Sequence, residues 1–98
     1  MTDKFRKLAD ANIELLPLLE IGTHFVFARD GFAALVERIN QEFGSVGTAG
    51  LLTEKGIAPL VWRGGSAHFQ AKGFTQAATG EDVRRLRAFQ SDLQNALT

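Results

Sequence analysis

Apolar residues recur at helical spacing near the start of the chain. The stripe consists of Phe5, Leu8, Ala9, Ile13 and Leu16. Thr2 precedes it as a possible N-cap, and Pro17 follows it, where the proline ring disfavours helix for the preceding residue. This pattern predicts a helix over about residues 3–16.

A second apolar stripe occupies the end of the chain. Its members are Val83, Leu86, Phe89, Leu93 and Leu97. Thr79 and Asp82 stand before it at the spacing of a capping box, in which the hydroxyl accepts the amide N–H three residues on. We expect an amphipathic helix over about residues 80–97.

Between these helices, β-branched and aromatic residues flank the dipeptide Asp30-Gly31. This dipeptide suits a type I′ turn, because both of its positions need positive φ. A two-residue loop pairs residues whose numbers sum to 61, which sets His24 against Glu37. We prefer this hairpin, since the apolar run before the turn needs a neighbouring strand.

The segment after the turn also fits a helix. Asp30 would then be the N-cap and Gly44 the C-cap of a helix over residues 31–43. Its apolar stripe would comprise Phe32, Leu35, Val36, Ile39 and Phe43. The sequence leaves strand and helix both open for this segment.

Two further turns follow, at residues 54–56 and at Gly64-Gly65. In the first, Gly56 can take the left-handed position of a three-residue turn. The second predicts strand pairs on one face, namely Ala58 with Ala71, Leu60 with Phe69 and Trp62 with Ala67. The opposite face carries Val61, His68, Gln70 and Lys72. One face is therefore core and the other is mixed.

Together these elements predict a single α+β domain over residues 1–98. Its architecture is an antiparallel meander sheet of about five strands, with the N-terminal and C-terminal helices packed on it. If residues 31–43 are helical, the sheet has fewer strands but the class is unchanged.

Glycine recurs at every third position from Gly44 to Gly50. A phosphate-binding loop needs a different spacing and a following helix, whereas an apolar pair and a turn follow here. We therefore interpret the stretch as the start of a strand. Simple alternation places Gly44 and Gly50 on one face and Gly47 on the other, and an aromatic ring or another backbone is expected close against the strand.

The composition removes several classes of function. Eleven basic and eleven acidic side chains cancel, so the sequence predicts no nucleic-acid partner. There is no cysteine for disulfides or thiolate chemistry, and the two histidines lack the spacing of a zinc site. Charges run through residues 1–14, and no apolar span approaches the roughly 20 residues of a membrane helix. We expect a cytoplasmic protein without membrane contact, metal or other cofactor.

Three side chains are candidates for ligand binding: His24, Glu37 and His68. Histidine moves protons near neutral pH, and the hairpin brings a carboxylate opposite His24. No nucleophile accompanies this pair, so no catalytic residue is assigned. The contacts would serve a small ligand in a pocket between helix and sheet.

The hairpin also predicts an interface. Phe25, Phe27, Phe32 and Val36 crowd one face of the sheet, and the opposite face is apolar too. If both helices cover the same face, the other exposes more apolar area than a monomer normally shows, and a symmetric homodimer would bury it. A monomer with one helix on each face is the alternative.

The sequence thus favours a small non-catalytic interaction or scaffold module that forms a homodimer. The alternative is a small-ligand-binding protein, or a minor enzyme, with a pocket between helix and sheet. Neither the ligand nor a protein partner follows from the residues alone.

Overall fold

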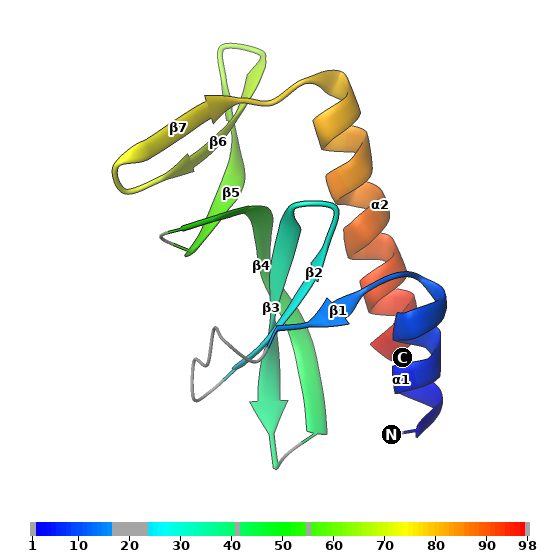
Figure 1. The fold of residues 1–98 in the computed structure, drawn as a ribbon. Coiled ribbons are helices and arrows are strands. Elements are labelled where there is room, and N and C mark those ends of the chain that lie inside the picture. The colour runs from blue at the N-terminus through cyan, green and yellow to red at the C-terminus, as the bar shows by residue number, and fades with distance from the viewer. Residues whose placement is uncertain (1, 17–23, 41, 55, 98) are drawn as a thin grey trace.

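The computed structural model describes residues 2–16, 24–40, 42–54 and 56–97. The elements in chain order are α1 (Thr2–Asp10), β1 (Glu14–Leu15), β2 (His24–Arg29), β3 (Phe32–Ile39), β4 (Glu42–Thr53), β5 (Gly56–Arg63), β6 (Ser66–Ala71), β7 (Phe74–Ala77) and α2 (Gly80–Leu97). In this part of the chain the strands form one seven-stranded antiparallel sheet, ordered β1 to β7, in which each strand lies beside the next (Figure 1).

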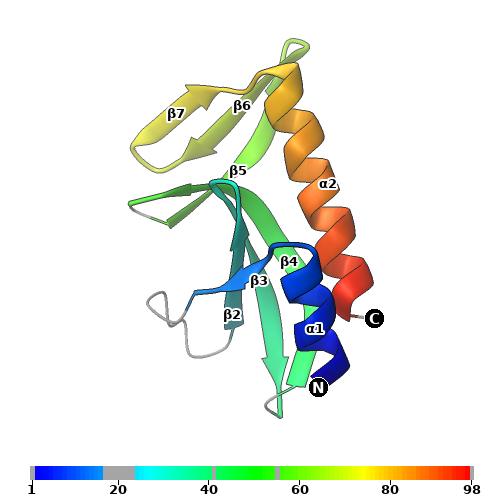
Figure 2. The same cartoon turned by 45° about the vertical axis from the view of Figure 1, so that its right-hand side comes forward.

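Both helices lie on the same side of the curved sheet, as Figures 1 and 2 show. α2 runs from the end of β7 back towards α1, and it contacts α1, β3 and β4. This arrangement confirms the predicted α+β meander with both helices packed on it. The described sheet has seven strands rather than about five. The prediction missed the short strands β1 and β7, because their sequences show no clear alternation of apolar and polar residues.

The predicted helix over residues 3–16 is wrong at its C-terminal end, because α1 ends before Asn12. Asn12 has φ 60°, and its N–H donates to the carbonyl three residues back. The Ile13 N–H donates to the Leu8 carbonyl at 2.9 Å. These bonds form a Schellman motif with asparagine in the left-handed position, so the chain leaves the helix and enters β1. Pro17, the expected end of the helix, lies outside the described residues.

The Asp30-Gly31 hairpin forms with the predicted pairing. Asp30 has φ 53° and Gly31 has φ 85°, the positive values that a type I′ turn requires. His24 lies opposite Glu37, and every pair of β2 with β3 has numbers that sum to 61. Because β3 is a strand throughout, the helical alternative for residues 31–43 is wrong.

The Gly64-Gly65 turn likewise fixes the predicted register of β5 and β6. Both glycines have positive φ, and Leu60 lies opposite Phe69. Phe69 is fully buried, whereas Val61 on the opposite face is only half-buried. The predicted core face is therefore confirmed at Ala58 and Phe69, but it is wrong at Trp62, which is exposed at the tip of the hairpin.

The turn at residues 54–56 is tighter than its predicted three-residue form. Thr53 lies opposite Gly56, so Glu54 and Lys55 separate the paired positions. Gly56 has positive φ, 124°, as expected. Lys55 itself lies outside the described residues.

β4 carries the glycine repeat, and its pairing with β3 contains two register shifts. Ala34, Val36 and Arg38 of β3 lie opposite Ala49, Val46 and Phe43 of β4. A step of two residues in β3 is therefore matched by a step of three in β4, which places one extra residue, a β-bulge, at each shift. The spacing of three keeps Phe43, Val46 and Ala49 on the core side, where all three pack.

These bulges break simple alternation, so the predicted distribution of the glycines between the two faces does not hold. The predicted close approach of another backbone is confirmed at Gly50. A Cβ there would lie 2.1 Å from the carbonyl oxygen of Ala58 in β5. At Gly47, by contrast, the nearest atom to a Cβ would be the Leu35 carbonyl oxygen at 3.5 Å, an ordinary contact.

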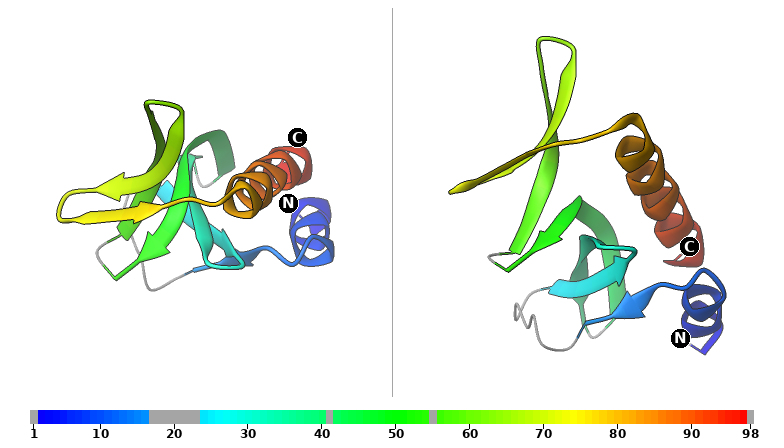
Figure 3. Two further views of the ribbon diagram at one scale, coloured as in Figure 1. Left: turned by 90° about the horizontal axis from the view of Figure 1, so that it is seen from above. Right: turned by 45° about the horizontal axis from the view of Figure 1, so that its top comes forward.

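Beyond the close approach of β4 and β5 at Gly50, the sheet changes direction. Strands β5, β6 and β7, here called the β5–β7 unit, stand away from β1–β4 (Figure 3). α2 spans both parts, with its first turns near the β5–β7 unit and its last turns beside α1 (Figure 2). The helix therefore forms a wall facing the inner side of the β5–β7 unit.

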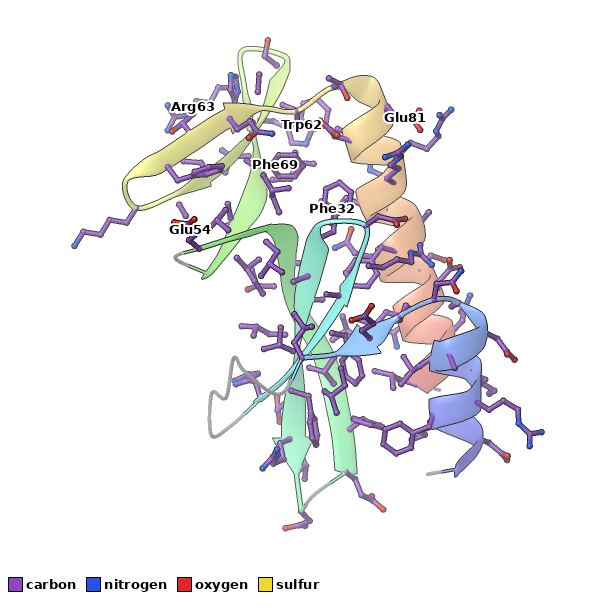
Figure 4. All side chains as sticks on the ribbon, viewed as in Figure 1. Phe32, Glu54, Trp62, Arg63, Phe69 and Glu81 are labelled. Carbon is purple, nitrogen blue, oxygen red and sulfur yellow. The ribbon has the colours of Figure 1, made fainter. Side chains whose placement is uncertain are left out.

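The core lies between the curved sheet and α2. Its largest fully buried side chains are Phe27, Val36, Phe69, Phe89 and Leu93. Phe32 connects the two parts of the sheet, since its ring centroid lies 5.8 Å from that of Phe69 (Figure 4). The buried stripe of α2 follows the predicted spacing of three and four, which confirms the C-terminal helix. Burial of each such side chain stabilises the fold by about 2 kcal/mol.

Arg29 joins three elements at the lower half of α2. Its Nη1 donates to the Ala11 carbonyl at 2.9 Å and to Asp92 Oδ2 at 2.8 Å. The guanidinium carbon lies 5.6 Å from the centroid of the Phe89 ring. The Arg29 side chain is 15% exposed, so these bonds form in a partly dry environment and tie β2 to the end of α1 and to α2.

We predict that Gly50→Ala lowers the free energy of unfolding by about 3 kcal/mol or more, because the new methyl group meets the backbone of β5. Gly47→Ala is the matched control, and it should change stability by less than about 0.5 kcal/mol. Urea denaturation followed by circular dichroism measures both. Equal effects of the two substitutions would contradict the close approach.

We predict that Arg29→Met lowers the free energy of unfolding by about 2 kcal/mol, since it removes two hydrogen bonds and leaves the Ala11 carbonyl without its donor. Arg85→Gln removes an exposed ion pair with Glu81 and should cost less than about 0.5 kcal/mol. Thermal and urea unfolding test the difference. A loss for Arg29→Met no larger than for the control would show that the three-way contact is not structural.

Candidate functional site

The β5–β7 unit has two distinct surfaces on its opposite faces. Trp62 and Arg63 are neighbours in β5, and Figure 4 shows their side chains on opposite sides of the strand. The inner face, which carries Trp62 and the buried Phe69, is directed at α2. The outer face, which carries Arg63 and Gln70, points away from the helices.

A cleft of about 400 Å³ lies between the tip of the β5–β6 hairpin and the start of α2, and residues from both faces of the hairpin line it. We call it the Trp62 cleft. Its lining includes the apolar Trp62, Ala67, Ala78 and Val83 and the polar Ser66 and His68. Trp62 is 55% exposed, more than any other large apolar side chain among the described residues. Its partner across the strand pair, Ala67, is too small to cover the indole ring.

The start of α2 forms one wall of the Trp62 cleft, and a capping box fixes its position. The Thr79 hydroxyl accepts the Asp82 N–H at 3.0 Å, and the Thr79 N–H donates to the Asp82 carboxylate at 2.9 Å. The predicted cap is therefore confirmed. Glu81, in the same turn, binds Arg84 and Arg85. The two acids together offset the positive end of the helix dipole, so this helix start does not favour an anion.

A shallow groove of about 640 Å³ lies on the outer face. We call it the outer groove. Its lining includes Val61, Arg63, Gln70, Lys72, Phe74 and Thr75. Arg63 and Lys72 are exposed, and neither forms an ion pair with any residue that the structure describes. The groove thus combines two uncompensated positive charges with a floor of half-buried apolar and amide groups.

Two buried polar atoms lie on the outer face of β6. They are His68 Nδ1 and Gln70 Oε1, and neither has a hydrogen-bond partner within the described part of the chain. The residues are two apart in one strand, so their side chains point to the same face. A buried polar atom without a partner costs about 1–3 kcal/mol. A bound molecule that supplies a partner would remove that cost, which singles out this face as a binding surface.

The structure brings together two of the three predicted ligand residues. His24 and Glu37 lie directly opposite each other on β2 and β3, with His24 half-buried and Glu37 exposed. His68 lies on β6, and three strands separate it from β2 in the sheet. His24 and Glu37 therefore lie apart from His68, which lines the Trp62 cleft.

The four predicted interface residues lie against the helices within one chain. Phe27, Phe32 and Val36 belong to the buried core, and Phe25 packs against it. The Arg38 guanidinium carbon also lies 4.4 Å from the centroid of the Phe25 ring. Because these side chains are already covered, the exposed surface available to a partner lies elsewhere.

The described residues contain no group of three or more histidine, cysteine or acidic side chains placed to hold a metal ion. Within the same residues, no helix is long and apolar enough to cross a membrane. Comparisons of the chain with protein-family models, with curated proteins and with solved structures found no match. The two surfaces of the β5–β7 unit are therefore the basis for a functional proposal.

Sequence reasoning did not single out Trp62, Arg63 or Lys72 as functional residues. For Trp62 a signal exists, because the hairpin register sets it opposite a small residue and next to a glycine turn. A large ring in that position is not covered by the side chain of the residue that pairs with it, so it is expected to be exposed. The convergence of Arg63 and Lys72 on one groove depends on the twist of the sheet, which the sequence does not encode in any local pattern.

We predict that Thr79→Ala lowers the free energy of unfolding by about 1 kcal/mol, because the Asp82 N–H loses its acceptor. Thr79→Ser keeps the hydroxyl and should retain most of the stability. Urea denaturation gives the energies, and the emission of Trp62, the single tryptophan, reports on the adjoining cleft. An equal loss for both variants would show that the cap does not hold the start of α2.

Proposed function

We propose that this protein is a small non-catalytic interaction module that forms a homodimer through the Trp62 cleft. The observation that carries the proposal is the 55% exposure of Trp62 beside a cleft lined by both apolar and polar residues. Tryptophan is strongly enriched among the residues that dominate binding energy at protein interfaces. A half-exposed indole at the tip of the β5–β6 hairpin is therefore a suitable anchor for a partner surface.

Three further features support a second copy as the partner. The net charge of the chain is zero, so two copies do not repel each other. Most residues that line the cleft are small, among them Ala67 and Ala78, which permits close packing. In a two-fold dimer the same patch serves both copies, so the ring of each protomer can cover the cleft of the other.

A small-ligand-binding role in the same cleft is the second candidate. It is favoured by Ser66 and by His68, whose buried Nδ1 lacks a partner among the described residues. A cleft of this size is within the range that holds small organic ligands. The composition favours a cytoplasmic location for either role, and no catalytic residue is assigned. A metabolite that stabilises the dilute monomer against heat would favour this candidate over the dimer.

We predict that the wild-type protein sediments as a dimer at tens of micromolar and that Trp62→Ser sediments as a monomer, because the variant lacks the anchoring ring. Ile39→Ser is the matched control. Ile39 is 50% exposed on β3, outside the β5–β7 unit, so its removal should leave the dimer intact. Circular dichroism checks that both variants fold.

Two results would contradict the proposed dimer. The first is a wild-type protein that remains monomeric up to about 1 mM, a concentration at which even weak specific association is visible. The second is a Trp62→Ser variant that dimerises as well as the wild type.

A further inference from the structure

The outer groove has the charge and shape of a second recognition surface. We propose that it binds an extended acidic peptide segment of a partner protein, with carboxylates of the peptide on Arg63 and Lys72. This goes beyond the proposed homodimer, because the groove and the Trp62 cleft share no lining residue. A peptide in the groove and a second copy at the cleft would therefore bind independently.

The positions of the two cations favour an extended ligand over a compact one. Arg63 lies opposite Ser66, the first residue of β6, and Lys72 follows the last residue of that strand. At about 3.3 Å per residue, Ser66 and Lys72 are roughly 20 Å apart along the strand. Both side chains nevertheless line one groove. A small monoanion would reach one of them, whereas an extended peptide of about seven or more residues, at the same rise per residue, spans both.

The floor of the groove fits a peptide backbone. Gln70 Oε1 is a buried acceptor without a donor in the described residues, and a peptide N–H supplies one. Thr75 is opposite Gln70 on β7 and exposes a hydroxyl that can donate to a peptide carbonyl. Val61 and Phe74 are half-buried and leave apolar surface for the side chains between the acids.

A nucleic acid fits the same surface less well. Its closely spaced phosphates call for a broader basic surface, and single strands also stack their bases on exposed aromatic rings. The groove has two separated cations, and its one aromatic residue, Phe74, is half-buried. Glu54 lies just beyond Phe74 in an adjoining small pocket, where it would repel a continuous line of negative charge.

The test uses fluorescein-labelled peptides of about nine residues, long enough to span the groove. One alternates glutamate with threonine, so that the acids share a face, and the other replaces glutamate with glutamine. Fluorescence anisotropy at low salt, about 50 mM, measures the affinity, since higher salt screens exposed charges. We expect saturable binding of the glutamate peptide to the wild-type protein and at least about tenfold weaker binding of the glutamine peptide.

The charge assignment is tested by a double variant, Arg63→Gln with Lys72→Gln. It should weaken binding of the glutamate peptide about tenfold. Its control, Arg6→Gln with Arg87→Gln, removes the same charge from exposed sites on α1 and α2 and should leave the affinity within about twofold. Amide resonances of residues 61–75 should shift when the peptide binds, and those of α1 should not.

Each contrary result overturns the acidic-peptide site. These results are an absence of saturable binding, an equal loss in the control variant, shifts centred outside the groove, or tighter binding of a uridine oligonucleotide than of the peptide. The sedimentation of each variant, measured alongside, separates this site from the homodimer. If peptide binding fails while the wild-type protein still dimerises, the acidic-peptide site is excluded and the proposed homodimer is retained.

Discussion

The close crossing of β4 and β5 at Gly50 determines how the two parts of the sheet are joined. A side chain there would enter the backbone of Ala58, so the two strands can meet only at glycine. The two bulges before it keep Phe43 and Val46 on the core side while β4 advances three residues for every two of β3. Bulges also increase the local twist of a strand. The sheet therefore leaves this crossing in a new direction, and the β5–β7 unit stands apart from β1–β4 (Figure 3).

This separation explains the positions of the two proposed binding surfaces. One helix, α2, spans both parts of the sheet, held at its lower half by Arg29 and at its start by the Thr79 cap. Its apolar stripe fills the core through Phe89 but does not cover Trp62 at the tip of the β5–β6 hairpin. On the other face of the same unit no helix packs, and Arg63 extends outward (Figure 4). Both surfaces are exposed because the sheet extends beyond the area that the helices cover.

Much of the fold follows from local signals in the sequence. Asp30-Gly31 and Gly64-Gly65 fix their hairpins because a two-residue loop with positive φ at both positions determines the pairing on either side. The capping residue Thr79 likewise marks the start of α2 without any tertiary information. Where the conformation of a turn allows only one pairing of its two strands, the sequence is sufficient to predict that pairing.

The remaining features depend on three-dimensional context. Leu16 continues the helical spacing of the first segment, yet Asn12 ends α1, and asparagine is a weaker stop signal than glycine. Bulges interrupt the alternation of side chains along a strand. The sheet face on which each glycine of β4 lies could therefore not be assigned by counting residues. The candidate site is harder still. Burial of Phe27 and exposure of Trp62 depend on which segments α2 covers, and no local pattern specifies that.

We propose that the protein recognises a second copy of itself through the β5–β7 unit and the start of α2. Amide hydrogen exchange at dilute and at concentrated protein tests it most directly, because association slows exchange at the surface that becomes covered. We expect slower exchange at high concentration in the residues around Ala67, Ala78 and Val83, which line the Trp62 cleft. Exchange that is independent of concentration, or that slows instead in α1 and the β3–β4 turn, would contradict it.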